Sequence, residues 1–178
     1  MTATEPLIEP ERHDDVSAID EVVRAAFGRE QVVDLVRQIR ASPHYLPELA
    51  LVARRDALVV GFVMLSGVDL VADGGERRAV LALSPLAVAP EVQDQGIGSA
   101  LVAAGLAAAA RTSAPMVTLE GSPRYYGRLG FERAARHDVR IDLPDWAPPE
   151  AAQVFLLPSY RPAIRGRLDY PPAFATLA

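Results

Sequence analysis

The fold is decided by the stretch Leu83-Ser84-Pro85-Leu86-Ala87-Val88-Ala89-Pro90-Glu91-Val92-Gln93-Asp94-Gln95-Gly96-Ile97-Gly98-Ser99-Ala100-Leu101-Val102. Its pattern predicts a strand that stops at a proline, then a short turn, then an alanine-rich helix over 96–111. Because glycine has no Cβ, Gly96 and Gly98 let a ligand come close to the backbone at the mouth of that helix. The free N–H groups and the positive dipole end of a helix start favour an anion. The turn is therefore a candidate site for a pyrophosphate or a similar group.

The glycine pair has a structural alternative, because glycine is common where a strand turns into a helix. Two standard anion-binding patterns do not fit. A P-loop needs a lysine, and this chain contains none. The dinucleotide fingerprint needs a third glycine where this chain has Leu101, and it belongs to the first βαβ unit rather than to the middle of a chain. Neither a P-loop nor a dinucleotide-binding fold therefore explains the turn.

Strands and helices alternate only in the second half of the chain, after a region that looks antiparallel. Apolar residues at helical spacing predict a helix over 14–28 and a second one that ends near Ser42-Pro43. The segment 78–88 is apolar nearly throughout, as expected of a strand covered on both faces. The other predicted elements are an edge strand at 7–8, a hairpin with strands over 49–55 and 58–66, a strand over 116–119, a short helix from Pro123, a strand that begins at Phe131, a strand over 153–157, and a mostly irregular, proline-rich tail over 158–178.

The composition is that of a globular chain without covalent cross-links. At 178 residues, half of them apolar, one domain with a sizeable core is expected. The absence of cysteine excludes disulfides and a thiol nucleophile and fits the cytoplasm. No apolar run approaches the roughly 20 residues that cross a bilayer, and residues 1–6 lack the pattern of a signal peptide. A net charge of −5 without a long basic cluster argues against a nucleic-acid partner, and three scattered histidines predict no metal site.

Two further segments extend the argument beyond the turn. Gln93-Asp94-Gln95-Gly96-Ile97-Gly98 has the pattern Gln/Arg-x-x-Gly-x-Gly/Ala, and Pro85-Leu86-Ala87-Val88-Ala89-Pro90 supplies the strand and proline before it. Downstream, Tyr126-Gly127-Arg128-Leu129-Gly130-Phe131 has the pattern Tyr-x-Lys/Arg-x-Gly-Phe. In this order and spacing they resemble the signature of the GCN5-related N-acetyltransferases (GNAT superfamily). Residues 121–131 are most similar to bacterial members with a Gly-x-Pro-x-Tyr-Tyr-Gly-Arg-x-Gly-Phe segment.

The resemblance implies a fold. It is an α/β (α+β) GNAT fold with a mixed, mostly antiparallel central sheet of about six or seven strands and about four helices. The sheet would be splayed between the fourth strand (78–88) and the fifth (116–119). We expect a single domain over 1–178, in which residues 5–145 form the N-acetyltransferase core. Residues 146–178 would be a C-terminal extension whose last strand lies beside Phe131, and whose tail covers either the acceptor side or a dimer contact.

The resemblance also implies acetyl transfer from acetyl-CoA to an amine. Because Asp94 and Gln95 leave the turn without a cation, it would hold the pyrophosphate through its N–H groups and helix dipole alone, with Asp94 directed outward. The pantetheine would pair with the fourth strand, one of whose N–H groups could stabilise the oxyanion. The cofactor-binding residues implied in this way are Leu86, Ala87, Val88, Gln93, Asp94, Gln95, Gly96, Ile97, Gly98 and Ser99.

By the same resemblance, Tyr126 is the candidate general acid that protonates the departing CoA sulfur. The alternative is that Tyr126 only packs against the sheet. Tyr125, about 100° further round the helix, would line the acceptor pocket or pack in the core. Glu120, at the end of the fifth strand, is the candidate base. The alternatives are that Glu120 is a solvated strand-end carboxylate and that the reaction uses no general base, as in some members of the family. His44 lies in a predicted loop where acceptor contacts occur in the family, although a surface role is the simpler expectation.

The function that follows is an N-acetyltransferase acting on a primary amine of a small molecule or a peptide. The alternatives are a non-catalytic acyl-CoA-binding or sensor module, and a structural domain without a nucleotide. We expect acetyl-CoA as cosubstrate and no metal. The expected partners are the amine acceptor and a second copy of the chain in a homodimer, with neither nucleic acid nor membrane. The chain is expected in the cytoplasm.

Overall fold

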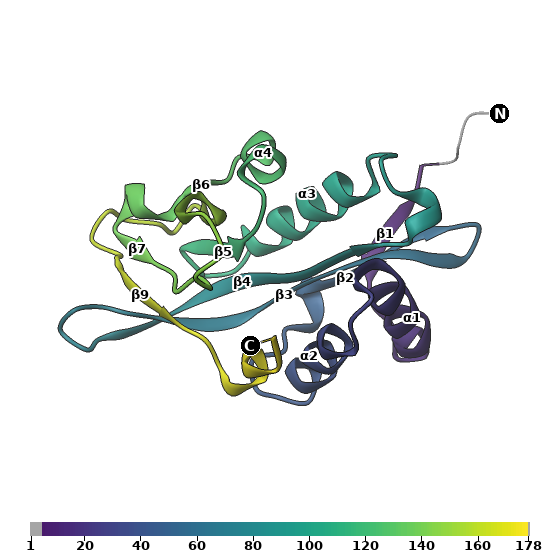
Figure 1. Ribbon diagram of the computed structural model, residues 1–178, viewed down its shortest axis with the longest axis horizontal. Coiled ribbons are helices and arrows are strands. Elements are labelled where there is room, and N and C mark those ends of the chain that lie inside the picture. The colour runs from purple at the N-terminus through teal and green to yellow at the C-terminus, as the bar shows by residue number, and fades with distance from the viewer. Residues whose placement is uncertain (1–4, 178) are drawn as a thin grey trace.

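Helices cover both faces of a nine-stranded sheet in the computed structural model, which describes residues 5–177. Figure 1 shows α3 on one face of the sheet and α1 and α2 on the other. Residues 1–4 and 178 lie outside the described residues. The prediction that residues 1–6 are no signal peptide and the predicted domain bounds of 1 and 178 fall there. The elements are β1 (Leu7–Pro10), α1 (Val16–Phe27), α2 (Glu30–Arg40), β2 (Ala50–Arg55), β3 (Leu58–Val71), β4 (Arg77–Val88), α3 (Ile97–Ala109), β5 (Met116–Glu120), α4 (Pro123–Tyr126), β6 (Glu132–Arg133), β7 (Val139–Arg140), β8 (Ala152–Leu156), β9 (Gly166–Asp169) and a C-terminal 3₁₀ helix (Pro172–Leu177).

The sheet is mixed and mostly antiparallel, as predicted. Its strands follow the order β1-β2-β3-β4-β5-β8-β6, and β9 pairs with both β3 and β7. Only β4–β5 and β7–β9 are parallel. The predicted last strand is β8, which inserts between β5 and β6 and so lies beside the strand that follows Phe131. The sheet has more strands than expected because β7 and β9 are too short to show a strand pattern in the sequence.

Two helical layers explain why the central strands are apolar on both sides. Along β2, Leu51 and Ala53 pack in the core under α3, while Ala50 and Val52 pack against α1 and α2. This alternation is the two-residue period of a strand whose two faces are both buried. The same division holds for β4, where Ala87 belongs to the α1–α2 core. A residue's position in a central strand therefore tells which helical layer it meets.

A bulge in β4 opens the sheet next to β5. Val63 pairs with Leu86 and Leu65 with Leu83, so that two residues of β4, Ser84 and Pro85, stand opposite one residue of β3. A bulge bends its strand and increases the local twist. β4 and β5 are paired only before this point, and β4 continues alone past the end of the pairing. We call the resulting gap between the two strands the opening, and it confirms the splay that was predicted there.

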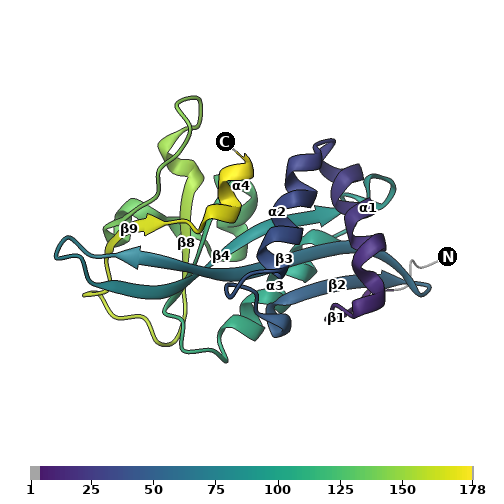
Figure 2. The same cartoon turned by 90° about the horizontal axis from the view of Figure 1, so that it is seen from below.

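The tail is more ordered than the sequence suggested. The prediction of a mostly irregular segment over 158–178 was wrong in part, because β9 pairs with the distal end of β3 and a 3₁₀ helix follows it. Figures 1 and 2 both show this 3₁₀ helix beside α2. The strand was missed because Gly166–Asp169 contains a single large apolar residue, Leu168, and so has no strand pattern. Its pairing with the distant strand β3 stabilises the extended backbone instead.

Candidate active site

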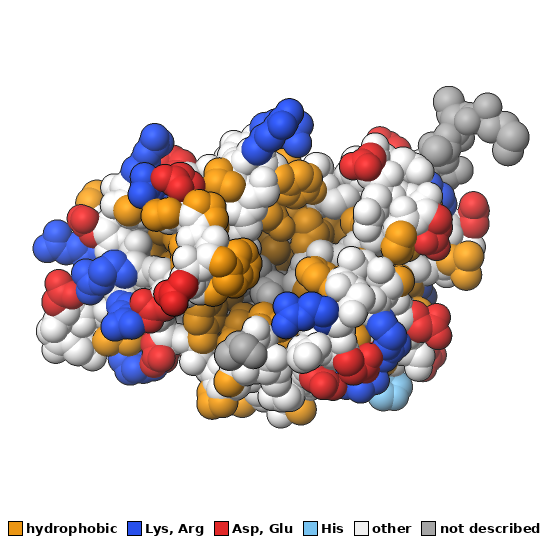
Figure 3. Space-filling view, in the orientation of Figure 1, with side chains coloured by type: hydrophobic (Ala, Val, Ile, Leu, Met, Phe, Trp, Pro, Cys, Tyr) orange, Lys and Arg blue, Asp and Glu red, His pale blue; other side chains and the backbone are white. Residues whose placement is uncertain are grey.

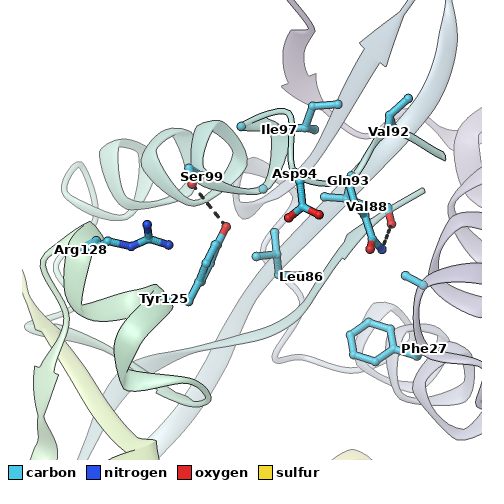
Figure 4. A pocket seen from close by; sticks show the side chains of 13 residues that line it. Phe27, Leu86, Val88, Val92, Gln93, Asp94, Ile97, Ser99, Tyr125 and Arg128 are labelled. Atoms are coloured by element: carbon cyan, nitrogen blue, oxygen red, sulfur yellow. Dashed lines mark hydrogen bonds between the residues drawn. The ribbon is translucent and has the colours of Figure 1, made fainter. Parts of the chain in front are cut away.

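A cleft of about 520 Å³ lies at the opening, between β4, the start of α3 and α4. Its volume is in the range of small-molecule sites. Figure 3 shows the corresponding face of the molecule hollowed at its centre, with apolar side chains inside the hollow. Figure 4 shows how the lining side chains converge from several elements. The cleft is lined by Ala26, Phe27, Leu86, Val88, Val92, Gln93, Asp94, Gly96, Ile97, Gly98, Ser99, Tyr125 and Arg128.

Residues 93–99, which we call the cofactor turn, lead from β4 into α3. Gly96 has a left-handed backbone with φ of 82°, which glycine adopts without steric cost. The helix begins at Ile97, and no side chain caps its first turn. The N–H groups of that turn are therefore left for a ligand, together with the positive end of the helix dipole. The backbone at the mouth of the cleft thus has the properties of an anion site.

Gly98 leaves a passage between α3, β4 and α4. A Cβ on Gly98 would lie 2.7 Å from the hydroxyl oxygen of Tyr125, and within 3.6 Å of Val88 and 3.7 Å of Leu86. The Tyr125 hydroxyl itself lies 3.4 Å from the Ser99 hydroxyl (Figure 4). Any side chain on Gly98 would consequently project into the cleft. The structure therefore brings Tyr125 together with the cofactor turn.

All the predicted cofactor-binding residues line the cleft except Ala87 and Gln95. Ala87 is buried, and its side chain faces the α1–α2 core rather than the cleft. Gln95 accepts a hydrogen bond of 2.8 Å from the guanidinium of Arg55 at the end of β2. The side chain of Gln93 donates to the Val88 carbonyl at 2.9 Å and ties the turn to the end of β4.

Asp94 was predicted to point outward, and this was wrong. It adopts a left-handed backbone with φ of 60°, which aspartate tolerates better than most residues. The chain reverses there, and the exposed carboxylate comes to line the cleft, as Figure 4 shows. A negative side chain at the mouth of an anion site opposes the ligand's charge. The cofactor turn therefore carries a charge that works against the role proposed for it.

Two cations near the turn were missed in the sequence. Arg128, in the turn that follows α4, is the one basic residue among the described residues that line the cleft. It occupies the Lys/Arg position of the downstream pattern, and this was the signal that could have found it. Arg55 comes from β2 and reaches the turn only through the fold. The turn itself has no cation, but these two residues place positive charge at its borders.

Tyr126 lies at the β5 end of the opening. Its ring is partly buried, contacts Phe131 edge-on with centroids 5.6 Å apart, and passes so close to Gly121 that a Cβ there would lie 2.6 Å from a ring carbon. Desolvation, with a smaller contribution from Tyr125, raises the pKa of Tyr126 to about 12. The hydroxyl has no hydrogen-bond partner among the described residues and retains contact with solvent. Tyr126 thus holds a proton at neutral pH and has no internal acceptor for it.

Glu120 ends β5 on the face opposite to Tyr126. Its neighbour Leu119 packs in the core under α3, so strand alternation turns Glu120 toward the α1–α2 side. The hydroxyl of Tyr170 donates to the carboxylate at 2.9 Å. Desolvation raises the pKa of Glu120 above its ordinary value, helped by Asp142 and opposed by the hydrogen bond from Tyr170. A carboxyl shifted in this direction is a better proton acceptor near neutral pH.

His44 does not reach this cleft. It lies against Gly67 in a separate pocket, where its carbonyl accepts a hydrogen bond of 3.0 Å from the Gly67 N–H. Within residues 5–177 there is no cluster of three or more His, Asp or Glu side chains that could hold a metal ion. Over the same part of the chain, no helix is both long and apolar enough to cross a membrane.

The sequence and the fold are similar to those of known acetyltransferases. The family model of the acetyltransferase (GNAT) domain matches residues 47–133. YhbS of Escherichia coli (strain K12), described as an uncharacterized N-acetyltransferase, is 34% identical over 131 residues, which are 73% of this chain and 75% of the relative. The chain therefore belongs to the GNAT family of acetyltransferases.

Solved structures extend the likeness to almost the whole chain. The crystal structure of Escherichia coli YhbS in complex with CoA superposes with a TM-score of 0.87 at 31% identity, over 98% of this chain and 94% of that one. A GNAT family acetyltransferase from Brucella melitensis in complex with acetyl-CoA gives a TM-score of 0.76 at 28% identity, over 95% and 97% of the two chains. Since the superposition with YhbS spans the tail, β9 and the C-terminal 3₁₀ helix are part of the shared architecture.

Proposed function

We propose that this protein transfers an acetyl group from acetyl-CoA to a primary amine of a small molecule or a peptide. The observation that carries the proposal is the opening itself, which has an uncapped helix start at one end and a protonated tyrosine at the other. Family membership and the CoA complexes of the relatives support the same cosubstrate.

The pyrophosphate of acetyl-CoA would lie on the N–H groups of the cofactor turn, with Arg128 and Arg55 supplying charge from either side. The pantetheine would pass over Gly98 and along β4, whose edge is unpaired toward β5 beyond the bulge. Tyr125 would form the opposite wall of this passage. The thioester would then lie in the opening, where a free N–H of β4 can stabilise the oxyanion.

Tyr126 would act as the general acid. The amine nitrogen attacks the thioester carbon, the C–S bond breaks, and the sulfur takes the proton of the Tyr126 hydroxyl. The raised pKa keeps the phenol protonated at neutral pH, which is the state that a general acid must have when the thiolate forms beside it. Tyr126 recovers its proton from solvent, which its hydroxyl still contacts.

Glu120 would take the first proton from the acceptor. An ammonium cannot attack, so it must lose one proton before the C–N bond forms and a second as the amide forms. Glu120 accepts the first and passes it to solvent. The second leaves to solvent directly, and with one proton taken up by the CoA sulfur the reaction releases one proton in total. The face of β5 that carries Glu120 is opposite to the one that carries Tyr126, so acid and base would act from the two sides of the thioester.

The proposal is tested by mixing the protein with acetyl-CoA and a panel of primary amines, and by following thiol release together with the mass of each amine. Acetylation of at least one amine, with equal thiol release, is the expected result. CoA binding without thiol release for any amine would indicate the sensor module instead. If the protein does not bind CoA at millimolar concentration, the remaining hypothesis is a structural domain that binds no nucleotide. The chemical identity of the amine, the homodimer and the cytoplasmic location stay predictions.

A further inference from the structure

The C-terminal tail packs on the face of the sheet that lies opposite to α3. Phe174, in the C-terminal 3₁₀ helix, packs both against the α1–α2 core and against the core under β5, β8 and β9. Ala87 of β4 belongs to the first of these cores. The tail therefore joins the α1–α2 core to the core that includes β5 and β8 on this face, where the amine would arrive if the cofactor occupies the α3 side.

Tyr170 joins this tail to the end of β5. It directly follows β9, its ring stacks on that of Phe174 with centroids 4.7 Å apart, and its hydroxyl donates to Glu120 at 2.9 Å. The phenol is partly buried, and desolvation together with the Glu120 carboxylate raises its pKa, so it stays protonated and can only donate to the carboxylate. A charge-assisted hydrogen bond of this kind fixes the direction in which a carboxylate presents its second oxygen.

The segment before Tyr170 is held in place by contacts with distant parts of the sheet. In β9, Leu168 pairs with Leu70 of β3, and Asp169 is bound by Arg77 at 2.6 Å. Arg167 is paired with Asp142, the other titratable group whose charge acts on Glu120. Tyr170 thus starts from a fixed backbone, which is what positioning another side chain requires.

We infer that Tyr170 is a positioning residue, which holds the Glu120 carboxylate toward the acceptor amine so that one oxygen stays free to take its proton. The inference rests on the proposed acetyl transfer and assigns the tail to its acceptor side. Tyr170 itself touches neither the thioester nor the amine in this account. The tail, which the sequence left open between an acceptor cover and a dimer contact, then serves the reaction within one chain.

The test is Tyr170→Phe in the full chain, with Tyr160→Phe as a matched control. Tyr160 is another partly buried tail tyrosine, and its hydroxyl makes no hydrogen bond among the described residues. For Tyr170→Phe we expect kcat to fall about three- to tenfold, less than the full contribution of one hydrogen bond to a charged group, because the Glu120 carboxylate itself is still present. The KM for acetyl-CoA should not change. The acidic limb of the kcat profile should move to higher pH, because this hydrogen bond lowers the pKa of Glu120. The control should show neither effect.

Two further measurements separate a failure of this inference from a failure of the proposed function. In a Glu120→Gln background, Tyr170→Phe should cost nothing further, because there is no carboxylate left to position. An unmoved limb, or an additional loss in that background, would overturn the positioning role while acetylation stands. If the unaltered protein acetylates no amine, the proposed function falls. In that case, carboxyl NMR titration of the protein without substrates still tests the hydrogen bond between Tyr170 and Glu120. If Tyr170→Phe leaves the pKa of Glu120 unchanged, the positioning role is contradicted.

Discussion

The two faces of the opening between β4 and β5 are built from the chain in different ways. On the α3 face, the cleft is made mainly by residues 86–99 and by the segment around Tyr125 and Arg128, each continuous in sequence, with Ala26 and Phe27 of α1 at its border. On the opposite face, Glu120 meets a tyrosine 50 positions further along the chain, held by a strand that pairs with the far end of β3. The first face is a local structure placed on the sheet, and the second exists only once the sheet has formed.

In the proposed function, this difference places the two substrates against different parts of the sequence. A cofactor with fixed chemistry is met by backbone N–H groups and glycines, which a short motif can encode. In the proposed function, the acceptor would be met by side chains of β5 and the tail, whose identity no short pattern constrains. Changes on the α3 face should therefore alter acetyl-CoA binding and the departure of CoA. Changes on the opposite face should alter the removal of the proton from the acceptor ammonium, and so kcat and its dependence on pH.

The largest effect is expected from Tyr126→Phe. Removing the hydroxyl while keeping the ring against Phe131 should lower kcat about a hundredfold or more, the usual contribution of a general acid. The KM for acetyl-CoA should stay within about twofold, because the cofactor turn is untouched. Steady-state thiol release measures both quantities. Turnover equal to that of the unaltered protein would show that Tyr126 only packs against the sheet.

A side chain at Gly98 should come next. Gly98→Val puts a branched group where a Cβ alone would meet the Tyr125 hydroxyl at 2.7 Å, so the passage for the pantetheine is filled. We expect the KM for acetyl-CoA to rise tenfold or more, equivalent to about 1.4 kcal/mol. Gly127→Ala is the matched control, because its φ of −59° suits alanine and no atom lies within 4 Å of the added Cβ. Equal KM values for the two variants would show that the pantetheine does not pass over Gly98.

The opposite face is probed by pH. Glu120 can take a proton only when ionised, so kcat should rise with pH through its pKa, which lies above the ordinary value of 4.5. Tyr126 should impose no loss on the alkaline side until pH approaches its pKa of about 12. Glu120→Gln should lower kcat about tenfold or more and abolish the acidic limb. A limb that persists in Glu120→Gln would belong to another group.

The sequence could predict the fold class and the α3 face because their signals are local. Residues 93–98 and 126–131 carry their patterns without interruption, and the apolar run of β4 needs only its own length to be recognised. Glu120 could be named as the end of a strand, but its partner Tyr170 could not be found, since β9 has too few apolar residues for a strand pattern. The direction of the Asp94 side chain was predicted wrongly because it depends on a left-handed φ. Aspartate tolerates this φ but also adopts others, so its presence in the sequence does not reveal the φ.

The smallest effect is expected from Asp94→Asn, which removes a negative charge from the cleft but keeps the shape of the side chain. Acetyl-CoA should bind about two- to fivefold more tightly, the scale of an exposed charge interaction, and the gain should shrink at high salt. Asp138→Asn is the control, because Asp138 shares the left-handed backbone, with φ of 55°, in a loop outside the cleft. Tighter binding in both variants would point to net charge rather than to position.

The central claim, that the two faces of the opening serve different substrates, is tested most directly by calorimetric titration of CoA. The proteins to compare are the unaltered chain, Gly98→Val and Glu120→Gln. The account predicts that CoA binds Gly98→Val at least tenfold more weakly. It predicts that CoA binds Glu120→Gln with the affinity of the unaltered protein, although the kcat of that variant is about tenfold lower or more. A comparable loss of CoA affinity in both variants would contradict the division of the opening into a cofactor face and an acceptor face.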